Sequence, residues 1–115
     1  MTLGAEILAT RPSTNGIALD VLLREQHLLL QGHFPGLAIL PAVGQLHWAV
    51  QAARNFLAVP GRRVGFHFLK FNRLIRPLGP LRLTLQRGPE ATSVNFQLSQ
   101  FEQECASGQI RFADE

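Results

Sequence analysis

The stretch from Gly32 to Val50 reads GHFPGLAILPAVGQLHWAV, and the rest of the chain is best interpreted outward from it. Glycine and proline interrupt its first part, which predicts a loop. Pro41 then stands where a helix would begin, because its fixed φ suits the first turn and its missing N–H is not needed there. The stretch is almost wholly apolar, yet it carries His33 and His47, two groups that titrate near neutral pH.

Residues at helical spacing continue beyond this proline. They are Val43, Leu46, His47, Val50, Arg54 and Leu57. Pro60 and Gly61 end the run, and the opposite face holds Ala49, Ala52 and Phe56. Because little of the helix is polar, the pattern predicts a buried helix with His47 on its buried face.

The segments around this helix alternate apolar and polar residues, as strands do. A turn signal at residues 13–16 precedes a strand at 17–23, and residues 27–31 form a second candidate strand. After the helix, alternation predicts strands near 64–68, 81–86 and 94–98, and a last strand with a bulge at Ser107 and Gly108. This order predicts an α+β roll, in which an antiparallel sheet wraps around one long central helix.

Length and composition limit the class of protein. A chain of 115 residues suits one domain, spanning residues 1–115, and its 46% hydrophobic and 17% charged residues indicate a folded protein. So little surface charge suggests that another chain covers part of the surface. No apolar stretch is long enough to span a bilayer, so we expect a cytoplasmic protein without a membrane segment. Cys105 is the only cysteine, and a small packed side chain is the expected role.

The charge balance indicates the kind of partner. Eleven Lys and Arg residues against eight Asp and Glu residues give a net charge of +3, which favours an acidic partner. Nucleic acid is not expected, because the basic residues are scattered and no binding motif is present. The four histidines lack a familiar ligand spacing, so no metal is expected.

The motif GHFPG at 32–36, followed by Pro41-Ala42-Val43 and a polar residue at 47, resembles the 3-hydroxyacyl-carrier-protein dehydratases of the hotdog superfamily. That family has GHFPG, a short apolar spacer, P-G-V, and a carboxylate fourteen residues after the histidine. Here His47 stands at the position of the carboxylate and Ala42 at that of the glycine. The segment QLHWA at 45–49 is most similar to the divergent dehydratases of aryl-polyene and related pigment pathways. The predicted element order is also that of a hotdog fold.

The resemblance implies conversion of a 3-hydroxyacyl thioester to the trans-2-enoyl thioester without a metal or redox cofactor. A neutral His33 would remove the proton next to the carbonyl, as the matching histidine does in the family. The backbone N–H groups of Ala42 and Val43 would stabilise the enolate oxygen with the helix dipole. A protonated His47 could donate to the leaving hydroxyl, which would give a bell-shaped pH profile; it could also only position substrate, or be a core residue.

The resemblance also implies lining, docking and assembly. The residues expected to line the substrate tunnel are Phe34, Gly36, Pro41 and Leu46. The basic residues that could dock an acidic acyl carrier protein are Arg24, Lys70, Arg73 and Arg76, although a solvated strand face explains them equally well. Coenzyme A is an equally possible thioester handle. In the family the active sites form at a dimer interface, so His33 would face His47 of the partner chain.

Two other functions stay open. The same fold can direct water at the thioester carbon, which would make the protein an acyl thioesterase. The absence of a carboxylate at position 47 also allows a catalytically inactive hotdog subunit that binds acyl carrier protein or completes a heterodimer.

Overall fold

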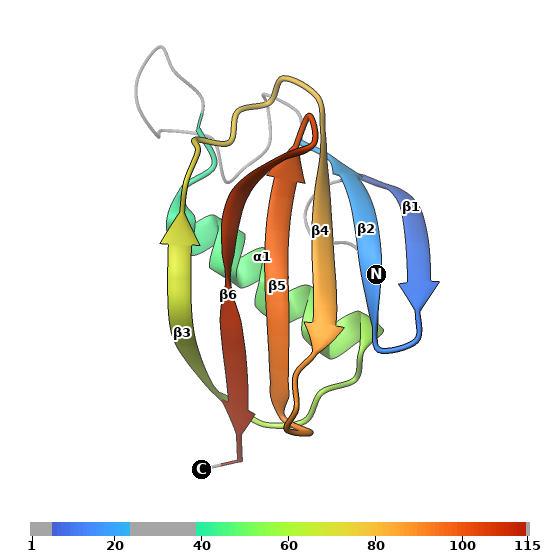
Figure 1. Ribbon diagram of the computed structural model, residues 1–115, viewed down its shortest axis with the longest axis vertical. Coiled ribbons are helices and arrows are strands. Elements are labelled where there is room, and N and C mark those ends of the chain that lie inside the picture. The colour runs from blue at the N-terminus through green and yellow to red at the C-terminus, as the bar shows by residue number, and fades with distance from the viewer. Residues whose placement is uncertain (1–5, 24–38, 115) are drawn as a thin grey trace.

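One helix and a six-stranded antiparallel sheet make up residues 6–23 and 39–114, the part of the chain that this computed structural model describes. The helix is α1 (Ala42–Phe56). The strands are β1 (Glu6–Ser13), β2 (Gly16–Leu22), β3 (Arg63–Phe71), β4 (Pro80–Arg87), β5 (Ser93–Gln100) and β6 (Gln103–Ala113). Their order across the sheet is β1-β2-β4-β5-β6-β3 (Figure 1). Strand β3 therefore lies at one edge of the sheet, although it precedes the central strands β4 and β5 in the sequence. No helix in the described residues is long and apolar enough to cross a membrane.

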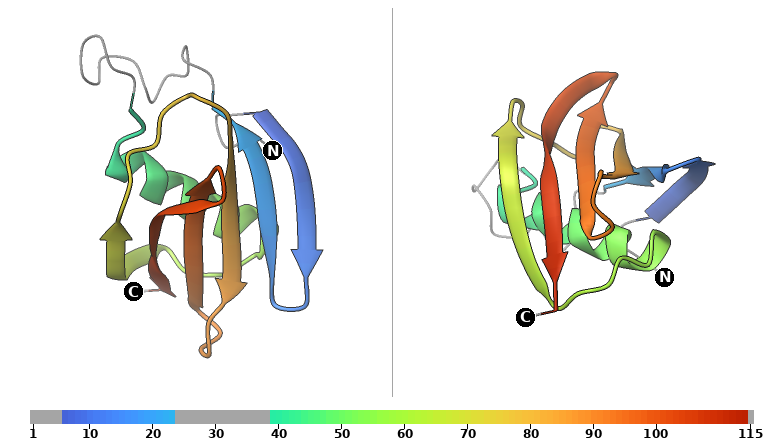
Figure 2. Two further views of the ribbon diagram at one scale, coloured as in Figure 1. Left: turned by 45° about the horizontal axis from the view of Figure 1, so that its top comes forward. Right: turned by 60° about the horizontal axis from the view of Figure 1, so that its bottom comes forward.

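The core lies between the sheet and α1. The sheet curves over the helix, which crosses its concave side (Figure 2). Alternate residues of the central strands point inward, as the sequence predicted, and Trp48 of the helix is fully buried against them. The inward-facing strand residues are Leu19, Val21, Leu81, Leu83, Leu85, Val94, Phe96, Leu98, Ile110 and Phe112. The α+β class, with an antiparallel sheet around one helix, is thereby confirmed.

The helix is not buried on all sides, and this corrects the sequence prediction. Its buried residues include Trp48 and Ala49, whereas Val43, His47 and Arg54 are exposed. The prediction that His47 lies on the buried face is therefore wrong for this chain. The sheet covers α1 from one side only, and residues spaced like 43, 47 and 54 share the face that points away from it.

The strands contain two further differences from the sequence prediction. Strand β1 was not expected as an element, and the candidate strand at 27–31 lies outside the described residues. The irregularity in β6 falls at Cys105 rather than at Ser107 and Gly108, which pair regularly with β5. One extra residue there lets Cys105 and Ala106 both be buried, which produced the phase shift in the sequence. Burial raises the pKa of the Cys105 thiol, consistent with a packed side chain.

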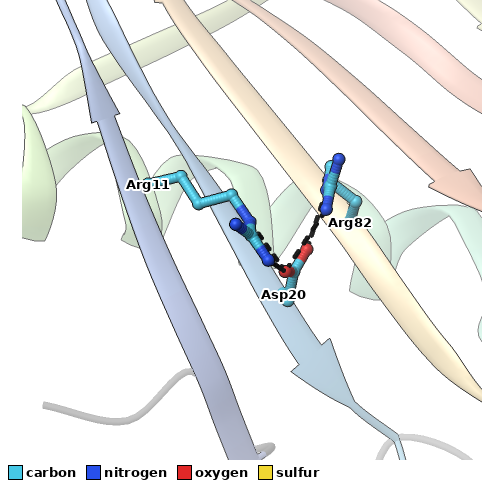
Figure 3. A network of polar contacts seen from close by, with 3 residues as sticks. All are labelled: Arg11, Asp20 and Arg82. Carbon is cyan, nitrogen blue, oxygen red and sulfur yellow. Dashed lines mark hydrogen bonds and ion pairs between the residues drawn. The ribbon is translucent and has the colours of Figure 1, made fainter.

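An ion-pair network joins three strands on the outer face of the sheet. Asp20 of β2 accepts hydrogen bonds from the Nε atoms of Arg82 in β4, at 2.8 Å, and Arg11 in β1, at 3.0 Å (Figure 3). The hydrogen bond from Arg82 is the main cause of a lowered pKa of Asp20, and the hydrogen bond from Arg11 lowers it further. Because the pKa of Asp20 is lower in the folded chain than in the unfolded one, its ionisation stabilises the fold at pH values above the ordinary pKa of Asp. This stabilisation is lost as the pH falls through the lowered pKa. Since all three side chains are near solvent, the contribution is modest.

Gly16, at the start of β2, leaves no room for a side chain. A Cβ there would overlap the carbonyl oxygen of Leu85 and lie 3.0 Å from the Cα of Gln86, so β2 and β4 would have to separate. We expect Gly16→Ala to lower the free energy of unfolding by about 3 kcal/mol, measured by urea denaturation. Gly65→Ala is the matched control, because its Cβ would make only an ordinary contact, 3.7 Å from His67. Equal stability of the two variants would contradict this account of the β2–β4 pairing.

Candidate functional site

The start of α1 is an uncapped helix N-terminus. Pro41 is the N-cap and makes no side-chain cap, and the first turn contains no acidic residue. The first bond of the helix runs from the N–H of Gln45 to the carbonyl of Pro41, at 3.1 Å. The N–H groups of Ala42, Val43 and Gly44 therefore have no acceptor within the helix. Together with the positive end of the helix dipole, they suit an oxygen atom that carries negative charge.

The exposed face of α1 carries His47, the histidine of the predicted helix. Val43, in the first turn, is 73% exposed, and His47 follows one turn later on the same face and is also exposed. Leu46, one of the predicted lining residues, is half-buried and packs against the hydrophobic core. An exposed valine beside an exposed imidazole leaves this face open to a substrate or to another chain.

The structure brings together only some of the predicted site residues. Ala42, Val43 and His47 share the first turns of α1, with Pro41 directly before them. The others in the motif and one docking candidate lie outside the described residues: His33, Phe34, Gly36 and Arg24. The remaining docking candidates are all exposed, in or just after β3: Lys70, Arg73 and Arg76.

A cavity of about 340 Å³ adjoins the start of the helix. Its walls come from the segment that leads into α1 and from the end of β3 with the residues that follow. The lining residues are Ile39, Leu40, Pro41, Ala42, Gln45, Phe71, Asn72, Arg73 and Leu74. Arg73 and Pro41 thus meet at one cavity, although they are far apart in sequence.

Gln45 is the residue of this site that the sequence analysis did not single out. It is a buried amide in a cavity wall, on the stripe of α1 that faces the sheet. Its Nε2 donates to the carbonyl of Leu40 at 3.0 Å. The signal was present in QLHWA, where a glutamine occupies a position that the helical period assigns to the apolar side.

The edge strand β3 exposes a row of large apolar side chains. They are Phe66, Phe68, Leu69 and Phe71, and we call them the apolar edge. Phe68 is 76% exposed and has a positive φ of 57° in a bulge that interrupts the pairing with β6. A sheet edge with unpaired backbone groups and exposed aromatic rings is a surface that proteins normally cover.

A second cavity, of about 510 Å³, lies on the outer face of the sheet around Arg11, Asp20 and Arg82. Both arginines are already paired with Asp20, and no residue of the GHFPG and helix motif lines this cavity. We therefore assign the candidate site to the start of α1.

A curved antiparallel sheet around one helix is the architecture of a hotdog fold, and the comparisons with known proteins agree. The chain belongs to the ApeI-like dehydratase family, whose model, described as ApeI dehydratase, matches residues 9–109. The hotdog dehydratase resemblance predicted from the sequence is thus confirmed. No curated protein matches the chain.

Three solved structures illustrate the similarity. The dehydratase heterocomplex ApeI:P from Xenorhabdus doucetiae aligns with a TM-score of 0.84 and 21% identity, over 96% of this chain and 97% of that one. The dehydratase domain of the polyketide PpsC from Mycobacterium tuberculosis gives 0.77 and 18%, over 100% of this chain and 46% of that one. An uncharacterized protein from Erwinia carotovora subsp. atroseptica gives 0.71 and 25%, over 93% and 94%. At these identities the likeness establishes the fold.

Proposed function

We propose that this chain removes water from a 3-hydroxyacyl thioester and forms the trans-2-enoyl thioester by acid/base catalysis with His33 and His47. The observation that carries the proposal is the position of His47. The chain belongs to a dehydratase family, and His47 is exposed within two turns of an uncapped helix start. It stands where the 3-hydroxyacyl-carrier-protein dehydratases that the motif resembles have a carboxylate. The thioester handle is acyl carrier protein or coenzyme A, in a fatty acid or polyene pathway.

The chemistry divides among three groups. The free N–H groups at the start of α1 donate to the thioester carbonyl oxygen and stabilise its negative charge as the enolate forms. Neutral His33 takes the proton from C2, and the electron pair of that bond moves toward the carbonyl. Protonated His47 donates to the hydroxyl on C3, which leaves as water as the C2–C3 double bond forms. Alanine at position 42 keeps the N–H donor that the family's glycine supplies and adds one exposed methyl group.

The proposal includes a second hotdog chain, either another copy or a different subunit. Two exposed features of the described residues support this, namely the apolar edge of β3 and the helix face with Val43 and His47. The similar ApeI:P structure is a heterocomplex. In the proposed assembly, His33 of one chain faces His47 of the other, in a cytoplasmic homodimer or heterodimer of chains that each form one domain over residues 1–115.

Charge supports docking of an acidic carrier protein near the helix start. Lys70, Arg73 and Arg76 are exposed in the segment that begins near the end of β3, and Arg73 lines the cavity at α1. Exposed cations of this kind increase the encounter rate with an acidic partner and make it depend on salt.

A second function, an inactive subunit of a heterodimer, is supported by the imidazole at position 47. A neutral histidine cannot supply the negative charge of the carboxylate that the resembled 3-hydroxyacyl-carrier-protein dehydratases have at this position, so this chain could contribute only part of a site to an active partner.

The test is turnover of a 3-hydroxyacyl carrier-protein thioester, followed by mass spectrometry. We expect the enoyl thioester to accumulate with the purified chain alone. Free acid and thiol in its place would identify a thioesterase. Product only after a second hotdog chain is added would support the heterodimer, and no product with either preparation and several acyl chains would reject the dehydratase proposal.

A further inference from the structure

Gln45 has one satisfied and one unsatisfied end. Its side chain is only 5% exposed, and its Nε2 donates to the carbonyl of Leu40 at 3.0 Å. Because a carbonyl can only accept, the group that faces Leu40 must be the amide nitrogen, and Oε1 is the end of the amide that this bond leaves without a partner. No donor in the described part of the chain reaches this oxygen, although it is buried. A buried acceptor without a donor is unfavourable, so a donor supplied by a ligand would stabilise it.

The same cavity borders the start of α1. Ala42 lines it beside Gln45, and the N–H groups of the first turn of α1 have no acceptor within the helix. The remaining walls are largely apolar, and exposed Arg73 lies among the residues of the opposite wall. The cavity therefore suits a slender ligand that presents a carbonyl oxygen toward the helix start and an N–H or O–H donor toward Gln45.

The helix geometry separates Gln45 from His47. Residues two apart are about 200° apart around an α-helix, so the two side chains leave α1 on opposite sides. Burial agrees, because Gln45 is buried and His47 is exposed. A thioester carbonyl held at the helix start can extend its acyl arm, with the C3 hydroxyl, toward His47. Its other arm, attached through sulfur, then runs toward the cavity of Gln45.

The arm attached through sulfur has a suitable donor close to the reacting carbon. In carrier-protein and coenzyme A thioesters alike, the sulfur is followed by two methylene groups and then by an amide N–H. Resting on the proposed function, we propose that Gln45 is a substrate-positioning residue whose Oε1 accepts a hydrogen bond from this first amide. The contact recognises what both handles share and sets how far the thioester advances over the helix start.

The test compares two small substrates that differ in one group. They are 3-hydroxyacyl thioesters of N-acetylcysteamine, which retains the first amide, and of 2-mercaptoethyl acetate, in which oxygen replaces the N–H. We expect the parent protein to favour the amide substrate at least about tenfold in kcat/KM. Gln45→Met, which keeps the volume and removes the acceptor, should bring this ratio close to one. Because the two kcat/KM values are compared within one preparation, their ratio does not depend on what fraction of the protein is active.

The matched control is Gln86→Met, because Gln86 is exposed on β4 and lies outside the cavity. It should keep the tenfold preference. A parent without preference, or a Gln45→Met variant that retains the full preference, would overturn the proposal. If Gln45→Met does not fold, Gln45→Leu replaces it, and the ratio of the parent alone can still reject the proposal.

Failure of the proposed function would be recognised separately. If the parent removes no water, the unreactive thioether analogues of the two substrates are compared by calorimetry. Binding of the amide analogue about tenfold more tightly by the parent, but not by Gln45→Met, would support Gln45 as the acceptor in a binding site. Equal affinities of the parent for the two analogues would refute it.

Discussion

Replacing His47 by alanine is expected to lower kcat for water loss about a thousandfold and to leave stability almost unchanged. The rate falls because no group remains to protonate the leaving hydroxyl, and general acid–base catalysis typically contributes a factor of this size. Stability persists because the side chain is exposed on α1. His33→Ala should cause a comparable loss through the missing base. The measurement is single-turnover formation of the enoyl thioester, with unfolding curves for each variant.

His67→Ala is the control, because His67 is an exposed histidine of β3 that the proposed mechanism does not use. It should retain most of the activity. His47→Glu introduces the carboxylate that the resembled 3-hydroxyacyl-carrier-protein dehydratases have at this position, and it should recover part of the lost rate. If only His33→Ala were inactive, His47 would merely position substrate, and full activity of both alanine variants would reject the two-histidine mechanism.

Mixing the two inactive variants is expected to restore about a quarter of the parent activity. If His33 and His47 of one site come from different chains of a homodimer, a dimer of His33→Ala with His47→Ala contains one site with both histidines. Random exchange makes about half of the dimers mixed, and each has one working site of two. The measurement is turnover after the two variants are refolded together.

A mixture of His33→Ala with the double variant is the control, since no dimer in it contains a complete site. Absence of recovery in the first mixture, with an active parent, would mean that both histidines of a site belong to one chain. Recovery would also identify a homodimer that is active without a different subunit.

The sequence by itself determined the family and most of the secondary structure. The alternation in β2, β4 and β5 and the run that starts after Pro41 are local patterns, produced by the periods of strand and helix against one apolar layer. The GHFPG motif and its spacing to residue 47 indicated the dehydratase family, which residues 9–109 match. Strand β1 was not predicted, because none of its residues is fully buried and only Ile7 and Ala9 are half-buried, so its apolar alternation is short and weak.

Only the tertiary structure decided which face of α1 is covered. The helix looked apolar all round, and the sequence therefore placed His47 inside, but one sheet can cover only one side of one helix. The placement of β3 at the sheet edge, next to β6, likewise depends on pairings distant in sequence, and it is what exposes the apolar edge. The unsatisfied oxygen of Gln45 depends on where the carbonyl of Leu40 lies. The periodicity of a sequence indicates which residues are apolar enough to be buried. The packing of the sheet against the helix decides which of them are buried and which groups they contact.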